Sequence, residues 1–493
     1  MSSDNTCSSN NSHNEGEILD IDEFLMRSGE CGPYQFRLVV LIKILTFPLS
    51  FPVFLFYFIG VDPEWTSSQN LKSHQKDDIR RCSMNRSDWT YDYPKTTLVT
   101  EYDLVCNDSW ILALLGSSVF IGWGFGSIIM GYLSDIYGRK AVMLPTIFLD
   151  LFCLFLHGFI KPIWLLVFIR FMMGVFHAGP ALNAFILLVE FIGPNCRVLA
   201  ANIAGTVWVI GSAALALQAY FIDDWRILCI VCSAPYFVVL VFGICLPESI
   251  RWLNAIGRTD RAEVILHNAA KINKRVDMTK VSIKPANAET LTFSYFDLFK
   301  DFKTANIVLS QAFLWFIAGM AYYTFSWTFA DLGGDIYINF FLSIAVEVPM
   351  HAVAVVCLQM FGRKTTAITA FLVTCIACLA ISCLSLFDDL KAYELLFGLV
   401  GKSMISLSFM SIFMWSAEIY PTVVRTQGMG INTITSRAGA AASPFIKVLD
   451  HIHPSIPFVI MAAATFMAFL FCFMLPETLG KPTRETFSEL TDA

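Results

Sequence analysis

The sequence is poor in charge for its length. Asp, Glu, Lys and Arg make up 15% of its 493 residues, and apolar residues make up 56%. A soluble domain typically has about 25% charged residues. The mean hydropathy is +0.60, and the charged residues gather in a few segments with long apolar runs between them. These features predict an all-α membrane protein, because each spanning helix needs about 20 apolar residues.

Signals for other classes of protein are lacking. The net charge of -6 and the pI near 5.8 give no overall basic surface for a nucleic acid. We recognise neither a nucleophile–base pair nor a group of metal ligands, so we expect no enzyme, no cofactor and no metal. Gly401, Lys402 and Ser403 imitate the end of a phosphate loop, but the required earlier glycine is Leu396. Residues 1–36 contain no apolar signal-peptide segment and are expected to form a cytosolic tail.

Most of the fourteen cysteines lie in apolar runs, where cysteine behaves as a small hydrophobic residue. Cys82 and Cys106 differ, because they are the two cysteines of the polar segment 61–109. If this segment is extracellular, we expect them to form a disulfide. Asn85 begins an Asn-Arg-Ser sequon in the same segment and is a candidate glycosylation site.

Apolar runs predict twelve spans, which place both ends of the chain on one side of the membrane. The spans are expected near 38–60, 110–133, 141–160, 163–187, 198–222, 226–246, 305–329, 338–360, 365–386, 392–416, 428–449 and 456–475. The span 428–449 is weakly apolar and carries Asn432 and Arg437. Polar spans tend to line cavities.

Basic residues in the short loops predict the orientation, because cytosolic loops are enriched in Lys and Arg. One side carries Arg139, Lys140, Arg197, Arg363, Lys364 and Arg425, and the other carries Lys161, Arg226 and Lys391. The first side is therefore predicted to be cytosolic. The basic segment 247–304 agrees, and we expect it to contain an amphipathic helix on the membrane surface. We expect the plasma membrane as location, with both termini cytosolic.

Three short patterns occur twice in the same order. Gly138-Arg-Lys returns at Gly362, the acid-to-arginine step from Glu190 returns at Glu418, and Leu246-Pro-Glu-Ser returns as Leu475-Pro-Glu-Thr, each 224 to 229 residues later. This repeat predicts two six-helix halves of the same orientation. The halves are expected at 37–246 and 305–475, joined by a cytosolic connector at 247–304 and followed by a cytosolic tail at 476–493.

Several motifs resemble those of known transporters. Residues 131–140, GYLSDIYGRK, resemble the loop signature of the major facilitator superfamily. The stretches TEYDLVC at 100–106, PESIRWL at 247–253, GGDIYIN at 333–339 and EIYPTVVR at 418–425 resemble the organic cation, anion and carnitine transporter family, solute carrier family 22. The resemblance implies an alternating-access transporter of small organic ions that is embedded in the lipid bilayer. Coupling of its transport to an ion is left open.

Charged residues gather at the cytosolic ends of the predicted spans. They are Asp135, Arg139, Glu190, Arg197, Glu248 and Arg251 in the first half, echoed by Arg363, Glu418 and Arg425 in the second. The functional interpretation is a charge network between helices that holds the cytosolic side shut, since opposite charges interact strongly in a partly dry environment. The alternative is that they are anchors that reach toward the membrane surface.

Ionisable residues deep in the membrane are functional candidates, because burying them is costly. They are Asp150, His157, Arg170, His177, Glu347, His351, Lys402 and Arg437. Glu347 and His351 share one helix face, and Glu347 lies in a V-E-V-P stretch that resembles a family motif whose acid faces the central cavity. Lys402 either lines the cavity or holds the second half together.

Arg437 is the most informative of these residues. The resemblance implies that Arg437 occupies a position at which the cation-carrying branch of the family has Asp, whereas the anion and carnitine branches have Arg. An arginine disfavours a purely cationic ligand and can bind a carboxylate bidentately. With Glu347 nearby, a zwitterion such as carnitine is favoured, followed by organic anions and then organic cations. In the alternative interpretation, Arg437 and Glu347 neutralise each other.

Aromatic residues on two spans complete the candidate site. Tyr322, Tyr323 and Trp315 lie on span seven and Trp208 on span five. Their ring faces attract quaternary ammonium groups. A different class of function, a receptor or scaffold that transports nothing, stays open at this stage.

Overall fold

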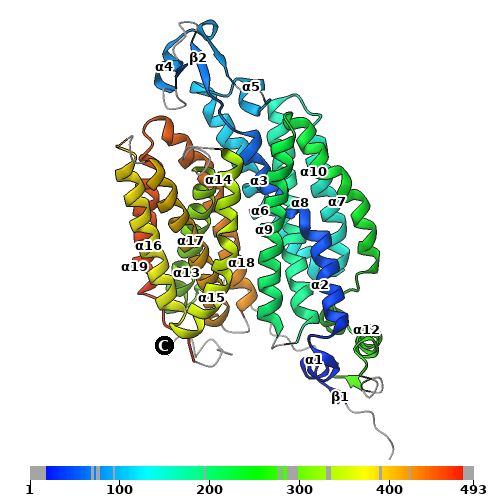
Figure 1. The fold of residues 1–493 in the computed structure, drawn as a ribbon. Helices are drawn as coiled ribbons and strands as arrows, with labels where there is room; N and C mark the ends of the chain where they lie inside the picture. The colour runs from blue at the N-terminus through cyan, green and yellow to red at the C-terminus, as the bar shows by residue number, and fades with distance from the viewer. Residues whose placement is uncertain are drawn as a thin grey trace, which may run out of the picture.

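The computed structural model describes residues 18–67, 72–73, 78–92, 95–193, 196–275, 278, 281–285, 298–328, 335–387, 391–420 and 424–480. Two helical bundles stand side by side, one built from the first half of the chain and one from the second (Figure 1). A small lobe lies at one end of the molecule and a second lobe at the other end. We call the end that carries residues 61–108 the loop end, and the end that carries Gly138 and Gly362 the basic end.

Twelve long helical segments make up the two bundles in the described part of the chain. In the first half they are α2 (Pro33–Thr46) continued by a 3-10 turn and α3 (Ser50–Ile59), α6 (Ser109–Tyr137), α7 (Arg139–His157), α8 (Ile163–Phe191), α9 (Arg197–Phe221), and α10 (Trp225–Val239) continued by a 3-10 segment to Cys245. In the second half they are α13 (Phe302–Thr328), α14 (Ile336–Ala345) with α15 (Glu347–Met360), α16 (Arg363–Leu384), α17 (Lys391–Ile419), α18 (Arg425–Val448) and α19 (Ile456–Cys472).

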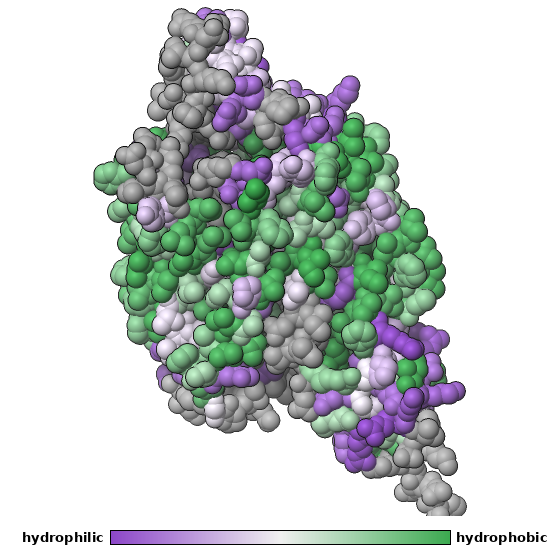
Figure 2. All heavy atoms as spheres, in the orientation of Figure 1, coloured by the Kyte–Doolittle hydropathy of each residue, from purple (hydrophilic) through white to green (hydrophobic). Residues whose placement is uncertain are grey.

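Nine of these helical segments, by length and composition, are long and apolar enough to cross a membrane, and the apolar parts of α9 and α19 are shorter. The polar helix α18 does not meet that criterion, as its sequence led us to expect. Figure 2 shows a hydrophobic band across the middle of the molecule with hydrophilic residues toward both ends. The band includes exposed aromatic and aliphatic side chains such as Phe125 and Ile128. The predicted all-helical membrane fold is confirmed.

Prolines account for the two interrupted spans. Pro349 has no N–H group to donate to the carbonyl of Ala345, the residue at which α14 ends. The chain turns at Val346, and α15 begins at Glu347. Pro48 lies in the 3-10 turn that separates α2 from α3. The proline after Glu347 thus fixes the point at which this acid enters the bundle.

The loop-end lobe is a small folded unit. Three strands, β2 (Trp65–Ser67), β3 (Lys72–Ser73) and β4 (Trp89–Tyr91), form an antiparallel sheet in the order β3-β2-β4. The helices α4 (Asp78–Ser83) and α5 (Leu98–Tyr102) follow β3 and β4. The structure joins Cys82 and Cys106 in a disulfide, and Asn85 lies exposed between them.

The lobe at the basic end corrects one expectation. It contains α1 (Ile21–Gly29), α11 (Ile250–Ala255), α12 (Thr259–Ile272) and a two-residue parallel pairing of β1 (Ile18–Leu19) with β5 (Ser282–Ile283). We expected α12 to lie on the membrane surface. Its apolar residues Leu266 and Ala270 instead belong to one core with Phe24 and Leu25 of α1, so the protein itself covers the apolar face of this helix.

The sequence repeat builds the same helix cap twice at the basic end. Glu477 accepts hydrogen bonds of 3.0 Å from the backbone N–H groups of both Arg363 and Lys364, at the start of α16. Glu248 accepts a 3.0 Å bond from the backbone N–H of Lys140, at the start of α7. Each carboxylate therefore satisfies the otherwise unpaired N–H groups of a helix N-terminus and faces its dipole.

Glycine is required where each cap is formed. Gly138 has φ +105° and Gly362 has φ +88°, a region that side chains with a Cβ rarely adopt. A Cβ at either position would also lie 2.5 Å from a carboxylate oxygen, of Glu248 or of Glu477. The glycines of the two Gly-Arg-Lys repeats therefore make room for the capping carboxylates.

The expected charge network at the basic end is present within each half. Glu418 accepts a 2.6 Å bond from the Thr478 hydroxyl and pairs with Arg363 at 2.7 Å. The equivalent acid of the first half, Glu190, accepts a bond from Ser249.

The other predicted gate residues also contact their own half. Arg139 pairs with Asp135 at 2.6 Å, Arg251 pairs with Asp22 of α1, and Arg425 donates to the carbonyl of Tyr420 at 3.3 Å. The Arg197 side chain lies outside the described part of the chain. In the described residues, none of these ion pairs joins the two halves, so in this conformation the network makes each half a unit.

The capping bonds also set the protonation of Glu477. Partial burial acts to raise its pKa, but the backbone N–H groups of Leu479, Thr478, Arg363 and Lys364 outweigh this effect, and the pKa of Glu477 lies below its ordinary value. The contribution of the charged carboxylate to stability is therefore present above the ordinary pKa of a glutamate and is lost only as the pH falls through the lowered value.

We predict that Glu248→Gln and Glu477→Gln each destabilise the protein by about 1 kcal/mol, because each removes the charge from a helix cap. The unfolding temperature of the purified protein at pH 7 should fall by a few degrees in each variant. Glu64→Gln at the exposed loop end is the matched control and should leave it unchanged. Equal unfolding temperatures in all three variants would show that the caps contribute nothing.

Candidate functional site

A cluster of polar and aromatic side chains lies where the two halves meet. The halves contact each other mainly along α6 against α18 and along α9 against α14. The second half contributes residues from α13, α15, α17 and α18, and the first half contributes residues from α3, α6 and α9. We call this set the central cluster. It holds all the side chains predicted to contact substrate except Trp315.

The first part of the central cluster is a buried ion pair. The Lys402 amine lies 3.2 Å from a carboxylate oxygen of Glu347, and both side chains are at most 5% exposed. The amine also donates to the Ser326 hydroxyl at 2.7 Å and lies 3.3 Å from the ring centroid of Tyr322. The Tyr322 hydroxyl donates to the second oxygen of Glu347 at 3.1 Å. The charge of Glu347 is therefore matched by Lys402.

The second part is Arg437, which has aromatic partners. Its guanidinium carbon lies 3.5 Å from the ring centroid of Trp123 on α6, and Nη1 donates to the Tyr323 hydroxyl at 3.3 Å. Its Nε has no hydrogen-bond partner among the described atoms. Within the described residues, no carboxylate forms an ion pair with Arg437. The alternative in which Arg437 and Glu347 neutralise each other is wrong for this structure, because Lys402 is the partner of Glu347.

His351 lies one turn after Glu347 and faces the first half. A Cβ at Gly205 of α9 would lie 3.0 Å from its ring, so glycine allows the histidine to approach this helix. Trp208, on the same helix, packs edge-on against Phe54 with 5.8 Å between the ring centroids. The central cluster therefore draws on both halves.

Trp315 lies apart from this cluster. Its indole N–H donates to the Ser416 hydroxyl at 2.9 Å, and its ring packs against Phe409 and Phe413 of α17. Trp315 is thus a core residue between α13 and α17, and it reaches the cluster only through Phe409, which also touches Tyr322.

The sequence did not point to the aromatic residues of the first half that meet Arg437 and Tyr323. Trp123 stacks on Arg437, and Phe120 lies 4.5 Å from the Tyr323 ring. Both residues lie in a glycine-rich apolar run of α6 that carries no charge. The sequence signal in this run is its row of glycines, which predicts close helix packing and does not single out the two aromatic residues.

An aromatic layer closes the molecule above the central cluster, toward the loop end. Tyr57 and Phe58 of α3 lie 4.7 and 5.0 Å from Phe340 of α14, and Phe58 also stacks on Tyr337 at 5.5 Å. A small pocket lies beside this layer and is lined by Tyr57, Gly60 and Trp327. Because these contacts join the two halves, the structure is closed at the loop end.

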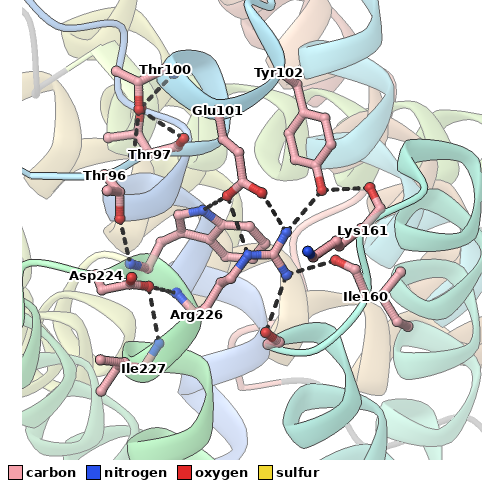
Figure 3. A network of polar contacts seen from close by, with 12 residues as sticks. Thr96, Thr97, Thr100, Glu101, Tyr102, Ile160, Lys161, Asp224, Arg226 and Ile227 are labelled. Atoms are coloured by element: carbon pink, nitrogen blue, oxygen red, sulfur yellow. Dashed lines mark hydrogen bonds and ion pairs between the residues drawn. The ribbon is translucent and has the colours of Figure 1, made fainter.

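A polar network fixes the loop-end lobe to the first half (Figure 3). The Glu101 carboxylate accepts from the Trp225 indole at 2.8 Å and from Arg226 at 2.6 Å. Arg226 also donates to the carbonyl of Ile160 at 2.7 Å, and the Tyr102 hydroxyl donates to that of Lys161 at 2.6 Å. The TEYDLVC motif thus anchors α5 to the ends of α8 and α10.

The fold, with its two similar bundles around a polar centre, is found in solved transporters. The chain is similar to the xylose transporter XylE from E. coli in an inward open conformation, with a TM-score of 0.64 and 15% identity over 93% of this chain and 99% of that chain. XylE bound to 6-bromo-6-deoxy-D-glucose gives a TM-score of 0.62 and 16% identity over 92% and 98%. The protein therefore has the fold of the major facilitator superfamily.

Sequence comparison places the chain within this class. The family described as "Sugar (and other) transporter" matches residues 69–489. The human organic cation/carnitine transporter 2 is 30% identical over 82% of this chain and 73% of its own length. A solute carrier family 22 member 15-like protein of Xenopus laevis is 28% identical over 96% of both chains, and rabbit organic anion transporter 3 is 29% identical over 82% and 76%. The chain belongs to the sugar (and other) transporter family and, within it, to solute carrier family 22, so the predicted resemblance is confirmed.

We predict that Lys402→Met destabilises the protein strongly, because it leaves Glu347 buried without its cation, at a cost of about 3–5 kcal/mol. The double variant Lys402→Met/Glu347→Gln should recover most of this loss, because a neutral pair needs no compensation. The unfolding temperature and the fraction of monodisperse protein after purification measure the effect. The ion pair is irrelevant if the single and double variants are equally stable.

Proposed function

We propose that this transporter carries small organic ions that bear a carboxylate, zwitterions such as carnitine first and organic anions second, across the plasma membrane. The observation that carries this proposal is the pairing in the central cluster. Lys402 neutralises Glu347, whereas Arg437 is held by Trp123 and Tyr323 and has no carboxylate partner in the described residues.

The charge of the central cluster favours a carboxylate. One cation, Arg437, is left after the ion pair cancels, and it repels a purely cationic ligand in this dry environment. A guanidinium offers parallel N–H donors to a carboxylate, and Nε of Arg437 has no partner to lose. Purely cationic substrates are therefore the third choice.

The aromatic walls favour a quaternary ammonium at the other end of the substrate. Phe54 packs against Trp208, the Tyr322 ring lies beside Tyr323, and ring faces attract such cations. Tyr323, Glu347, His351 and Lys402 complete the proposed substrate contacts. Trp315 acts on this set indirectly, because it packs against Phe409, which contacts Tyr322. Relatives bear the names of carnitine, organic anion and organic cation transporters. The pairing of Glu347 with Lys402 is our reason for the order of these substrate classes in this protein.

The positive-inside rule assigns the basic end, with both termini, to the cytosol and the loop end to the outside. In this orientation Asn85 is exposed on the extracellular lobe and is proposed to carry a glycan. Transport then requires the aromatic layer of Tyr57, Phe58 and Phe340 to separate on the outside. The charge networks around Glu190 and Glu418 keep each half intact while it moves.

The test is uptake of labelled carnitine, p-aminohippurate and tetraethylammonium into cells expressing wild type, Arg437→Lys or Arg437→Asp. Wild type should take up carnitine or p-aminohippurate saturably. Arg437→Lys keeps the charge but loses the bidentate bond, so KM should rise about 10-fold or more. Arg437→Asp should abolish this uptake and allow tetraethylammonium to enter.

Surface labelling of each variant controls for expression. Uptake of tetraethylammonium by wild type, unchanged in Arg437→Asp, would overturn the substrate assignment. Absence of saturable uptake for all three compounds would favour the receptor or scaffold alternative.

A further inference from the structure

A second buried pair of ionisable side chains lies in the first half. Nδ1 of His177 on α8 lies 2.9 Å from Oδ2 of Asp150 on α7, and the two side chains are 0% and 2% exposed. The other oxygen of Asp150 and the other ring nitrogen of His177 have no hydrogen-bond partner among the described atoms. Asp150 follows the start of α7 by 11 residues, or about 16 Å of helix, so the pair lies deep in the membrane.

This pair is next to the central cluster. The His177 ring meets the Trp123 ring edge-on with 4.4 Å between centroids, and the Arg437 guanidinium lies 3.5 Å from the centroid of Trp123. One indole therefore separates the imidazole of the first half from the cation of the second half. This contact crosses the interface between α6 and α18, along which the halves must move.

We propose that Asp150 and His177 together form a proton-binding site whose occupancy is coupled to carboxylate binding at Arg437. The inference rests on the proposed function, because it needs a carboxylate substrate at Arg437. The chain would then be a proton-coupled carrier of carboxylates.

The charge balance gives the direction of coupling. With one proton between them, Asp150 and His177 are net neutral, either as aspartate with imidazolium or as aspartic acid with imidazole. Without that proton the pair has charge -1, which is costly in a dry interior unless a cation is close. One such cation, Arg437, packs against the same Trp123 ring as His177. When a substrate carboxylate neutralises Arg437, the deprotonated pair loses this stabilisation and takes up one proton from the solvent.

Other ionisable groups around the pair do not supply this charge. On α7 the thiol of Cys153 lies one turn from Asp150 and interacts with it. On α6 the facing group is the uncharged ring of Trp123. Arg170, two turns before His177 on α8, donates to the carbonyl of Leu115, and Arg226 of α10 pairs with Glu101. In the described residues the ion-pair partner of Asp150 is His177.

The coupling must be reciprocal. A bound proton raises the affinity of Arg437 for a carboxylate by the same factor by which the carboxylate raises the affinity of the pair for the proton. An external pH below neutral should therefore lower KM for the substrate and affect the maximal rate less.

The experiment uses the full chain reconstituted in liposomes that contain a pH-sensitive dye. In wild type, adding carnitine or p-aminohippurate at equal pH on both sides should acidify the lumen, and an inward proton gradient of one pH unit should raise initial uptake at least about 3-fold. Labelled substrate and dye are recorded in parallel, so uptake and proton movement are separate readouts.

Asp150→Asn and His177→Gln should lose the acidification and the response to the gradient. Both should keep exchange of labelled for unlabelled substrate, which needs no net proton movement and shows that the variants are folded. His157→Gln is the matched control, because His157 is also buried on α7 but contacts Cys229 and lies away from Arg437. It should behave as wild type.

Saturable uptake by wild type without acidification or gradient response would overturn the proton site and leave the proposed function standing. The same holds if Asp150→Asn and His177→Gln keep the proton response, or if His157→Gln loses it equally. If neither compound enters, the proposed function fails, and the inference that rests on it fails with it. Should both site variants fail to fold, the wild-type recording still decides.

Discussion

The whole arrangement depends on how few acids the membrane interior contains to balance its cations. Lys402 and Arg437 both lie in the central cluster, and one acid, Glu347, is placed to compensate them. The acid is within reach of the lysine, so the arginine is stabilised by two aromatic side chains instead. A guanidinium tolerates this better than an ammonium, because it is planar, less strongly hydrated and stacks on rings. The uncompensated charge is thereby carried by the residue best suited to bind a carboxylate.

The repeat in the sequence has a mechanical meaning in the structure. In each half a glutamate after the last helix caps the third helix, and a neighbouring hydroxyl bonds to the acid at the end of the fourth or tenth span. These bonds join the third and fourth helices of a half to the segment that follows its last helix, and they do not cross to the other half. Two halves that are tied internally and meet mainly along two helix pairs are built to move as units. The conformational change is therefore concentrated at the contacts of α6 with α18 and α9 with α14.

Much of this was predictable from local patterns. Hydropathy predicts the spans, and short residue patterns predict the repeat and the family. The structure has the twelve helical segments and the two halves that these patterns indicate. The eleventh span was weak by hydropathy because its polar face lines the centre, and the requirement for an even number of spans supported it in place of hydropathy. The partner of α12 was not predictable. An amphipathic pattern indicates that something apolar covers one face of the helix, but lipid and the α1 helix would both satisfy it.

The pairing inside the central cluster also escaped the sequence. Glu347 and Lys402 are separated by a whole span, and neither position carries a spacing that signals an ion pair. From the motifs alone, Arg437 could have been the partner of Glu347, because the resemblance implies that both line the central cavity. Only the relative rotation of α15, α17 and α18 decides which cation reaches the acid, and that rotation is fixed by packing of many apolar side chains around each helix.

Trp123 links the proposed binding residue Arg437 to the contact between the two halves. It belongs to the half opposite to that of Arg437, and its ring lies on the guanidinium face, where a ligand must compete for the cation. A carboxylate that binds Arg437 in the plane of the guanidinium can keep this stacking, whereas one that approaches over the face must displace the indole and so weaken the contact between α6 and α18. A ligand shifts a conformational equilibrium only by its difference in affinity for the two states. The stacked arginine provides such a difference, because its contact with Trp123 exists only while the halves are together at this interface.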